Sequence, residues 1–365
     1  MMYRKYFNIM GVSVKKFIPD YRNIEAAAMN KRPVRLPFYE HLINEESMEN
    51  ITGKKFKELI KGDRKDKQEY FRNYNGFFLQ HEYDTVSFEC CVGGILPNAG
   101  ALRGHNPGAI HSLRELEKYP WEKLPGMYWD AFDKNFKSMG EMLPPGMKAV
   151  GGIGNGVFEI AEDLVGFESL CLLQADEPDT FSKLFVRIGD LLVELWTGFM
   201  KRHADAYAVC RIGDDMGFKT STLMSPQTII EHIVPQYRRV IKAIHSSGKP
   251  FLLHSCGCIF DVMDEMIASG IDAKHSNEDA IAPYDEWISR YGKRIGLFGG
   301  IDTDLLCRMS PDNIYEYVLE SASRFRATAN GYALGSGNSI PEYVPADGYL
   351  AMIRAGQEIR RRENT

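Results

Sequence analysis

The stretch YAVCRIGDDMGFKTSTLMSPQTIIEHIVPQYRRVIKAIHSSGKPFLLHSCG, from Tyr207 to Gly257, contains a complete strand–helix–strand unit. Its runs YAVCRI and FLLHS are short and mostly apolar, which is typical of parallel strands covered on both faces. Between them, Ser225-Pro226 predicts the start of a helix and Gly248 predicts its end. Pro235 falls inside this helix and should kink it, because proline lacks a backbone N–H donor.

The same alternation continues along most of the chain. Further helices are predicted from Pro178 to about Arg202 and from Ser310-Pro311 to about Asn330. This pattern favours a closed parallel barrel or a doubly wound sheet. Seven strands are expected, at Asp84–Cys91, Lys148–Gly154, Tyr207–Ile212, Phe251–Ser255, Asp272–Ser276, Arg294–Phe298 and Tyr332–Gly335. The sequence does not place an eighth strand.

The chain divides at about residue 82. Residues 1–82 are predicted to form an N-terminal helical extension that packs on the barrel, and residues 83–365 form the barrel itself. After the first strand, Gly93–Gly146 is a long insertion that is helical from about Tyr128 to Met142. A connection of this length is either a lid or binding loop or a plain surface insertion.

Composition argues against several classes of protein. The 365 residues carry a formal net charge of −5, so neither nucleic acid nor an anionic membrane surface is an expected partner. The seven cysteines are odd in number and irregularly spaced, as expected for reduced thiols in the cytoplasm. No apolar run reaches the roughly 18 residues of a membrane-spanning helix. The N-terminal stretch MMYRKYFNIMGVSVKKF lacks the features of a signal peptide.

Polar residues follow the predicted strands at their carboxyl ends. In a βα barrel these ends share one face, and that face holds the active site. Taken singly, each polar residue could be only a helix cap. The clusters are Gly213-Asp214-Asp215, Cys256-Gly257-Cys258, Asn277-Glu278-Asp279, Ile301-Asp302 and Asn338-Ser339.

Among these residues, His254 and Cys256 have the side chains best suited to binding a metal ion. Two residues apart on an extended chain, they point to the same side and could both bind one zinc ion. They could equally pack at a strand end without a metal. Cys258 reaches the same point only if Gly257 folds the chain back.

Two other pairs are adjacent in sequence, so their side chains should diverge. Of Asp214 and Asp215, one is expected in the pocket and the other at a helix start. Of Lys274 and His275, we favour His275 as the residue that faces the pocket.

Several motifs together resemble the uroporphyrinogen decarboxylase-like superfamily. They are the stretch GDDMGF to HSCG above, GIDAKHSNED from Gly270, RIGLFGGIDTDLLCRMSP from Arg294, and GYALGSGNSIPEYVP from Gly331. The resemblance covers roughly Tyr83 to the C-terminus. It implies an α/β fold of the (β/α)8 TIM-barrel type, with the pocket at the carboxyl ends of the strands.

The resemblance is to the corrinoid-dependent methyltransferase branch. Decarboxylases of the superfamily carry a Met-Arg-Gln-Ala-Gly-Arg motif that grips substrate carboxylates, and the nearest basic segment here, Lys31–Arg35, does not match it. Coenzyme M members of the methyltransferase branch hold zinc with a His-x-Cys pair and a later cysteine. His254 and Cys256 match the pair, whereas Asn338 stands where the third ligand would be.

The resemblance to this branch implies transfer of a methyl group from methylcobalamin on a corrinoid carrier protein to tetrahydrofolate or a similar small acceptor. An amine acceptor does not need zinc, which serves to lower the pKa of a thiol. The expected catalytic residues are His254, Asp215 and Glu278. The expected substrate-binding residues are Asp214, Cys256, His275, Asn277, Asp302 and Asn338. The candidate metal ligands are His254 and Cys256, with the third ligand missing.

Three alternatives stay open. The first is a uroporphyrinogen decarboxylase-type decarboxylase, and the second is a zinc-dependent methyltransferase with a thiol acceptor. The third is a barrel that binds a ligand without catalysis. The sequence does not decide whether the chain forms a homodimer.

Overall fold

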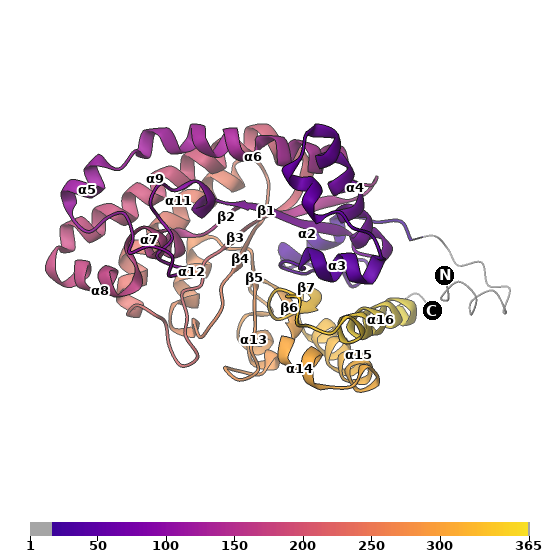
Figure 1. Ribbon diagram of the computed structural model, residues 1–365. Helices are drawn as coiled ribbons and strands as arrows, with labels where there is room; N and C mark the ends of the chain where they lie inside the picture. The colour runs from indigo at the N-terminus through magenta and orange to yellow at the C-terminus, as the bar shows by residue number, and fades with distance from the viewer. Residues whose placement is uncertain (1–16, 364–365) are drawn as a thin grey trace, which may run out of the picture.

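The computed structural model describes residues 17–363, which form a curled parallel sheet wrapped by helices (Figure 1). The prediction about a signal peptide falls, apart from Phe17, outside this range. The seven strands run in chain order across the sheet, each parallel to the next, which confirms the predicted α/β class. They are β1 (Thr85–Cys91), β2 (Lys148–Gly154), β3 (Tyr207–Gly213), β4 (Phe251–His254), β5 (Ala273–His275), β6 (Gly296–Ile301) and β7 (Tyr332–Ser336).

Helices precede the sheet and follow each of its strands. Before β1 lie α2 (Arg22–Ala28), α3 (Glu45–Thr52) and α4 (Arg64–Gln80). Between β1 and β3 lie α5 (Leu113–Lys118), α6 (Leu124–Glu141), α7 (Val157–Val165), α8 (Phe167–Asp176) and α9 (Pro178–His203). The later helices are α10 (Pro226–Thr228), α11 (Val234–His245), α12 (Met263–Ser269), α13 (Tyr284–Tyr291), α14 (Thr303–Arg308), α15 (Pro311–Thr328) and α16 (Ala346–Glu363).

The helix between β3 and β4 shows how local sequence shapes the fold. The Ser225 hydroxyl accepts the backbone N–H of Thr228, so the helix begins where the Ser-Pro pair predicted. The predicted kink takes the form of a π-helical turn over Ile229–Ile233, immediately before α11. Such a turn accommodates Pro235, which has no N–H to donate to the preceding turn.

An extended segment, residues 37–43, lies beside both the first and the last strand of the sheet. It exchanges backbone hydrogen bonds with β7, where Tyr39 donates to Leu334 and Leu334 donates to Pro37. On the other side, the Ser87 hydroxyl of β1 donates to the backbone carbonyl of Glu40. No eighth strand occurs within residues 17–363, and this segment occupies the gap between β7 and β1.

Helix α2 closes the sheet at the end where the strands begin. Ile24, Ala27 and Ala28 are fully buried in an inner core with small or apolar side chains from the strands. The approach is close, since a Cβ atom on Gly296 at the start of β6 would lie 2.2 Å from the Ala27 carbonyl oxygen. The polar residues of the predicted site lie at the opposite end, where the strands finish.

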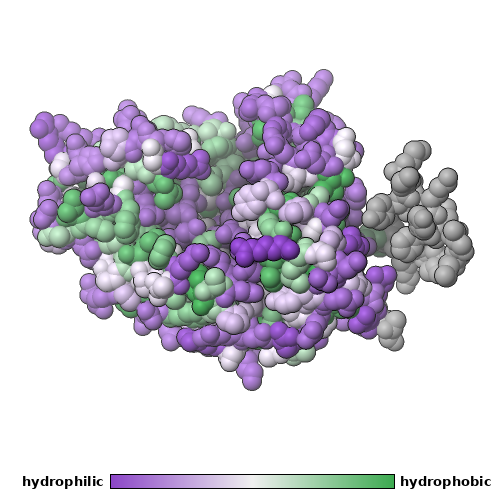
Figure 2. Space-filling view, turned by 60° about the horizontal axis from the view of Figure 1, so that its bottom comes forward, coloured by the Kyte–Doolittle hydropathy of each residue, from purple (hydrophilic) through white to green (hydrophobic). Residues whose placement is uncertain are grey.

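The face of the molecule drawn in Figure 2 is mainly polar. Figure 2 shows hydrophobic side chains in small patches between hydrophilic ones. Within residues 17–363, no helix combines the length and the apolar character that crossing a lipid bilayer would require.

Glu40 is a buried carboxyl group in the segment beside β7. It accepts hydrogen bonds from the backbone N–H and hydroxyl of Ser336 and from the hydroxyl of Tyr83. Burial raises the pKa of Glu40 to about 8, despite these donors. The folded protein therefore binds a proton at neutral pH that the unfolded chain releases.

We expect Glu40→Gln to reduce the pH dependence of stability. With a folded pKa of about 8 against an ordinary value of 4.5, Glu40 makes the free energy of unfolding fall as pH rises through this window. The fall is on the order of a few kcal/mol. Urea unfolding at pH 5 and pH 8.5 should show a smaller difference for Glu40→Gln than for the wild type. Equal differences would contradict the buried, protonated carboxyl.

Candidate active site

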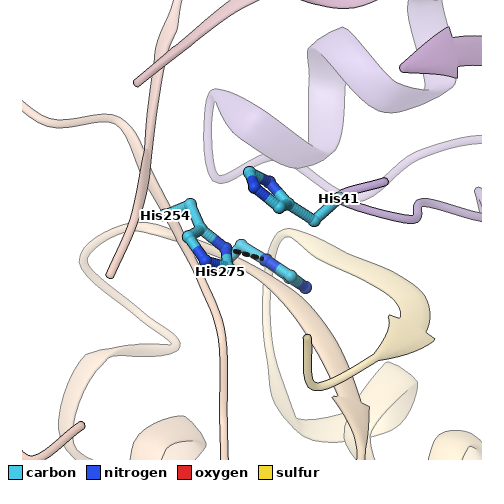
Figure 3. A group of neighbouring side chains, drawn as sticks. All are labelled: His41, His254 and His275. Atoms are coloured by element: carbon cyan, nitrogen blue, oxygen red, sulfur yellow. Dashed lines mark hydrogen bonds between the residues drawn. The ribbon is translucent and has the colours of Figure 1, made fainter. Parts of the chain in front are cut away.

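Two histidines that end neighbouring strands form the centre of the site. His254 ends β4 and His275 ends β5, and the strand register sets them side by side. Their Nδ1 atoms lie 2.7 Å apart, and both side chains are buried. Figure 3 shows the two rings meeting beside the segment that carries His41.

Hydrogen bonds on both sides of His275 determine which ring nitrogens carry hydrogen. His275 Nε2 lies 3.0 Å from the backbone carbonyl of Ser336, which can only accept, so this nitrogen is the donor. Burial lowers the pKa of His275 to about 3, so its ring is neutral and its Nδ1 accepts from His254 Nδ1. His254 Nε2 therefore keeps a free lone pair.

His41 completes the histidine cluster. Its ring stacks on that of His254, with centroids 3.7 Å apart and planes at 11° (Figure 3). It comes from the segment beside β7, far from the other two in sequence, and our sequence reasoning missed it. The one available signal was that His41 follows the short apolar run LPFY, as other polar site residues follow their strands.

A buried ion pair lies beside the cluster. Arg211 on β3 is fully buried and donates to the Glu89 carboxylate of β1 at 2.6 Å. Its Nη1 atom donates to the Tyr39 hydroxyl at 2.9 Å and to the His41 backbone carbonyl at 2.7 Å. Burial, with the nearby guanidinium charge, lowers the pKa of His41 well below its usual range. The histidines are therefore neutral at physiological pH.

Asp215 and Cys256 face the free lone pair of His254. Cys256 Sγ lies 3.4 Å from His254 Nε2, and Asp215 Oδ1 lies 3.8 Å from the same nitrogen. The Cys256 backbone N–H also donates to Asp215 Oδ1 at 2.8 Å. Asp215, His254 and Cys256 thus each present a ligand atom, all within 4.8 Å of one another.

The Cys256 sulfur receives two hydrogen-bond donors. The Ser276 hydroxyl and the Asn338 side-chain amide each lie 3.4 Å from Sγ. Ser276 holds its place with φ at 99°, a conformation that is rare for a residue with a side chain. Burial raises the pKa of Cys256 to about 12, so without an ion the thiol is neutral. Asn338 therefore serves as a donor to sulfur, although the sequence comparison set it at a ligand position.

Gly257 turns the chain directly after this cysteine. Its φ is 82°, and a Cβ atom there would lie 2.2 Å from the backbone of Gly217. The turn leads Cys258 to donate its backbone N–H to Phe218 at 2.6 Å. Cys258 does not belong to the group of donor atoms around His254 within the described part of the chain.

Asp214 differs from its prediction as a substrate-binding residue. Its side chain is fully buried and accepts the backbone N–H groups of Phe158 and Glu159 at the start of α7. The Tyr237 hydroxyl also donates to it, at 2.7 Å. With these three donors, Asp214 holds the start of α7 in place. Its side chain points away from that of Asp215, because adjacent residues of an extended chain face opposite sides.

Glu159 is a site residue that the sequence did not indicate. It accepts the Asp215 backbone N–H at 3.3 Å and the Asn155 amide at 2.8 Å. Burial, and then the adjacent Asp214 carboxylate, raises the pKa of Glu159 well above its ordinary value. On the same helix, burial raises the pKa of Glu162 to about 8.

A polar cavity of about 380 Å³ is lined by four of the predicted substrate-binding or catalytic residues, and it adjoins Cys256 through Asn338, whose amide donates to the Cys256 sulfur. These four are Asn277, Glu278, Asp302 and Asn338. Lys219 also lines the cavity, and Tyr343 at its wall is 70% exposed. A volume of this size suits a small organic ligand.

Two of these four also hold the surrounding loops in place. The side-chain oxygen of Asn277, Oδ1, accepts the Gly300 N–H at 2.9 Å. The side-chain nitrogen, Nδ2, is buried and has no hydrogen-bond partner among residues 17–363. Asp302 caps α14 through the Asp304 N–H at 2.8 Å and accepts the Asp279 N–H at 2.7 Å. Asp302 therefore both caps a helix and lines the cavity.

Lys274 turns away from the histidine cluster. Its ammonium group lies 3.9 Å from the centre of the Trp287 ring on α13 and donates to the Ser276 backbone carbonyl. Burial lowers the pKa of Lys274 to about 7. The structure thus places His275, rather than Lys274, in the site, as the alternation along β5 requires.

The site and fold can be compared with known proteins. The family described as Uroporphyrinogen decarboxylase (URO-D) matches residues 137–359, which is more than half of the chain. No curated protein matches the chain. A methyltransferase from Methanosarcina mazei is similar in structure, with a TM-score of 0.68 and 17% identity over 93% of this chain and 99% of that one. At this identity the likeness shows the fold alone.

Two glycoside hydrolases are less similar. The exo-beta-1,4-mannosidase Op5Man5 from Opitutaceae bacterium strain TAV5 has a TM-score of 0.47 at 11% identity, over 98% of this chain and 64% of that one. The family 5 enzyme PbGH5A from Prevotella bryantii B14 has a TM-score of 0.43 at 11% identity, over 78% and 86%. Neither likeness bears on function.

We expect Arg211→Met to destabilise the protein by about 3–5 kcal/mol, because it leaves the Glu89 carboxylate buried and unpaired. Arg239→Met is the matched control, since Arg239 and its partner Asp190 have side chains that are 43% and 48% exposed. That change should cost no more than about 1 kcal/mol. Urea unfolding measures the free energy of unfolding of both variants. Similar losses of stability in the two would show that the buried ion pair contributes no more than the exposed one.

We also expect fixed histidine tautomers. In long-range ¹H–¹⁵N spectra of ¹⁵N-histidine protein, His254 should carry hydrogen on Nδ1 and His275 on Nε2, with both rings neutral at pH 5. The hydrogen-bond chain to Ser336 and the lowered pKa of His275 require this result. Signals are assigned by their loss in His254→Gln and His275→Gln. Titration of either ring near its ordinary pKa would refute the assignment.

Proposed function

Because the chain belongs to the uroporphyrinogen decarboxylase (URO-D) family, we propose that it is a methyltransferase that uses the cavity beside Cys256 for its acceptor. The methyl group comes from a methylcorrinoid on a carrier protein, and tetrahydrofolate or a similar small molecule receives it. The similar structure from Methanosarcina mazei is described as a methyltransferase, which supports this class of reaction.

The observation that carries the proposal is the composition of the cavity. Carboxylates of Glu278 and Asp302 and side-chain amides of Asn277 and Asn338 line it together. A pterin presents amino and amide N–H donors and a carbonyl acceptor along one edge, and carboxylates and amides pair with such an edge. Glu278 is half-buried in the cavity wall. We assign it the role of accepting the proton that the acceptor nitrogen loses.

Charge argues against the decarboxylase alternative. A uroporphyrinogen carries several carboxylates and needs cations to bind it. The cavity instead contains Glu278, Asp302 and Asp304, with Lys219 as the one basic residue among those that line it. Arg211, a fully buried cation beside the histidines, is already paired with the Glu89 carboxylate. Like charges in such a pocket would repel a polyanion.

In the transfer itself, the methyl group moves without its bonding electrons, which stay with the corrinoid, and the acceptor atom loses a proton as its new bond forms. His254 is a poor acceptor for that proton, because burial lowers its pKa well below the usual range. The half-buried Glu278 carboxylate is better suited.

A thiol acceptor is the second candidate, and one observation favours it. The residues that match the zinc-binding pair, His254 and Cys256, hold their ligand atoms 3.4 Å apart. That separation suits two ligands of one tetrahedral zinc ion, with metal–ligand distances of about 2.0–2.3 Å. Zinc bound there would lower the pKa of a thiol acceptor and present it as a thiolate.

The test follows the cobalamin spectrum under anaerobic conditions. The full-length protein is mixed with methylcobalamin alone, with tetrahydrofolate, or with a small thiol such as 2-mercaptoethanesulfonate. We expect conversion to the cob(I)alamin spectrum only when tetrahydrofolate is present. Conversion with the thiol alone would favour the second candidate, and no conversion with either would reject methyl transfer. Release of carbon dioxide from uroporphyrinogen would establish the decarboxylase.

The role of Glu278 is tested in the same assay. Glu278→Gln should lower the rate with tetrahydrofolate by about 10²–10⁴-fold, the usual worth of a positioned proton acceptor. Glu316→Gln is the control, because Glu316 is exposed on α15. Equal rates for the two variants would remove Glu278 from the mechanism.

A further inference from the structure

Another cavity lies in the outer layer of helices, where α4 and α6 pack side by side (Figure 1). Its volume is about 380 Å³, and it shares no lining residue with the proposed acceptor cavity. Four basic side chains line it, Arg64 and Lys67 from α4 and Lys134 and Lys137 from α6. We infer that this cavity binds a phosphate group, with space for a small molecule that carries it. The inference goes beyond the proposed methyl transfer and does not depend on it.

Most basic residues near the start of α4 are neutralised by carboxylates. Lys55, Lys57 and Lys61 each form an ion pair with a nearby glutamate. Arg64 pairs with Glu141 at 3.0 Å, so its charge is also partly compensated. A basic side chain without such a partner is therefore an exception in this part of the chain.

The three lysines of the cavity are such exceptions. Lys67, Lys134 and Lys137 form no ion pair with any residue in the range 17–363. The Lys67 ammonium group donates to the backbone carbonyl of Ile60. Burial, and also the charge of Lys134, lowers the pKa of Lys67. Unpaired cations around one cavity repel one another, and a bound anion relieves that repulsion.

Asp63 is the one acidic residue among those that line the cavity, and its carboxylate already has partners. It accepts the backbone N–H groups of Lys65 at 2.7 Å and Asp66 at 3.1 Å, at the start of α4. The Asp66 carboxylate in turn accepts the Asp63 N–H, which completes a capping box. The four basic side chains outnumber this single carboxylate, so the cavity keeps an excess of positive charge.

Ser138 adds a hydroxyl group to the cavity wall. The residue is 3% exposed and directly follows Lys137 on α6. Its hydroxyl makes no hydrogen bond with any other residue of the described range. Because polar groups of buried residues are nearly always hydrogen-bonded, a hydroxyl left free at a cavity wall indicates a place for a ligand atom. A serine hydroxyl can donate its hydrogen to an anionic oxygen.

A phosphate group suits this set of donors. It carries up to two negative charges and three strong acceptor oxygens, so several ammonium groups and a hydroxyl can bind it together. Lysine binds phosphate as a point charge. The cavity volume is in the range of small organic ligands, and the aliphatic stems of lysine and arginine can pack against an organic part.

The other basic pair at a cavity is balanced by an acid. Arg103 and His105, in the long insertion, line a cavity of about 400 Å³ together with Asp163. Asp163 is 8% exposed, so its carboxylate faces these two residues with little water between them and bulk solvent. That cavity lacks the excess of positive charge found between α4 and α6.

Binding is measured by isothermal titration calorimetry on the full-length protein, without a methyl donor and in chloride buffer of constant ionic strength. The probes are inorganic phosphate, adenosine monophosphate and adenosine. We expect both phosphates to bind at one site per chain and adenosine not to bind below about 10 mM. Tighter binding of the nucleotide would assign the site to an organic phosphate, and tighter binding of inorganic phosphate would assign it to the free ion. Absence of binding by both phosphates, or equal binding of adenosine and its monophosphate, would overturn the inference.

Variants locate the site. The double variant Lys134→Gln with Lys137→Gln should weaken binding of both phosphates by about 10-fold or more, because it removes charged donors. Ser138→Ala should weaken binding by a smaller factor, since one neutral donor is lost. The control is Lys183→Gln with Lys293→Gln, which removes the same charge from two exposed lysines elsewhere. Equal losses of affinity in the two double variants would show non-specific attraction and overturn the inference.

Urea unfolding separates loss of binding from loss of folding. Without phosphate, the variant Lys134→Gln with Lys137→Gln should be at least as stable as the wild type, because like charges three residues apart on a helix repel. Added phosphate should raise the urea midpoint of the wild type and leave that of the variant unchanged. An equal rise in both would contradict binding at this cavity. Failure of methyl transfer would leave all these readouts unchanged, so the two proposals fail independently.

Discussion

The buried ion pair between Arg211 and Glu89 ties together parts of the chain that no local pattern would join. It links β3 to β1, and through Tyr39 and His41 it also holds the segment beside β7. A fully buried guanidinium is costly unless each of its donors is satisfied, and here carboxylate, hydroxyl and carbonyl oxygens satisfy them. Arg211 thus adds to the backbone hydrogen bonds with β7 that hold the segment of residues 37–43 in place.

The properties of the histidine cluster follow from that placement. Stacked beside a fixed positive charge and closed off from water, His41 and His254 stay neutral. A neutral imidazole with one nitrogen committed to a hydrogen bond has a lone pair on the other. The same burial that makes His254 a poor base makes it a good ligand, and this explains why the cluster is more suited to binding than to proton transfer.

The two ends of the sheet have different roles: one holds the inner apolar core and the other holds the candidate site. Helix α2 packs Ile24, Ala27 and Ala28 into the inner core at the end where the strands begin. At the other end, short strands finish in turns whose polar residues either cap helices or face the cavity. Asp302 does both, whereas Asp214 and Asp215 divide the two tasks between them.

Local sequence determined much of this protein. All seven strands, the helix that starts at Ser225 and the gathering of polar residues at strand ends could be read from apolar runs, caps and breakers, because these signals lie within a few residues of the element they specify. The pairing of His254 with Cys256 was also local, since alternate residues of a strand share a side.

Only the tertiary structure decided how the site is completed. His41 comes from a segment outside the predicted barrel, Asn338 donates to the Cys256 sulfur, and Asp215 stands opposite His254. The register between β3 and β4 sets Asp215 opposite His254, and the other two contacts join residues that lie far apart in the sequence. Spacing along the chain carries no information about such contacts, because they arise from the curvature of the sheet and the packing of its ends.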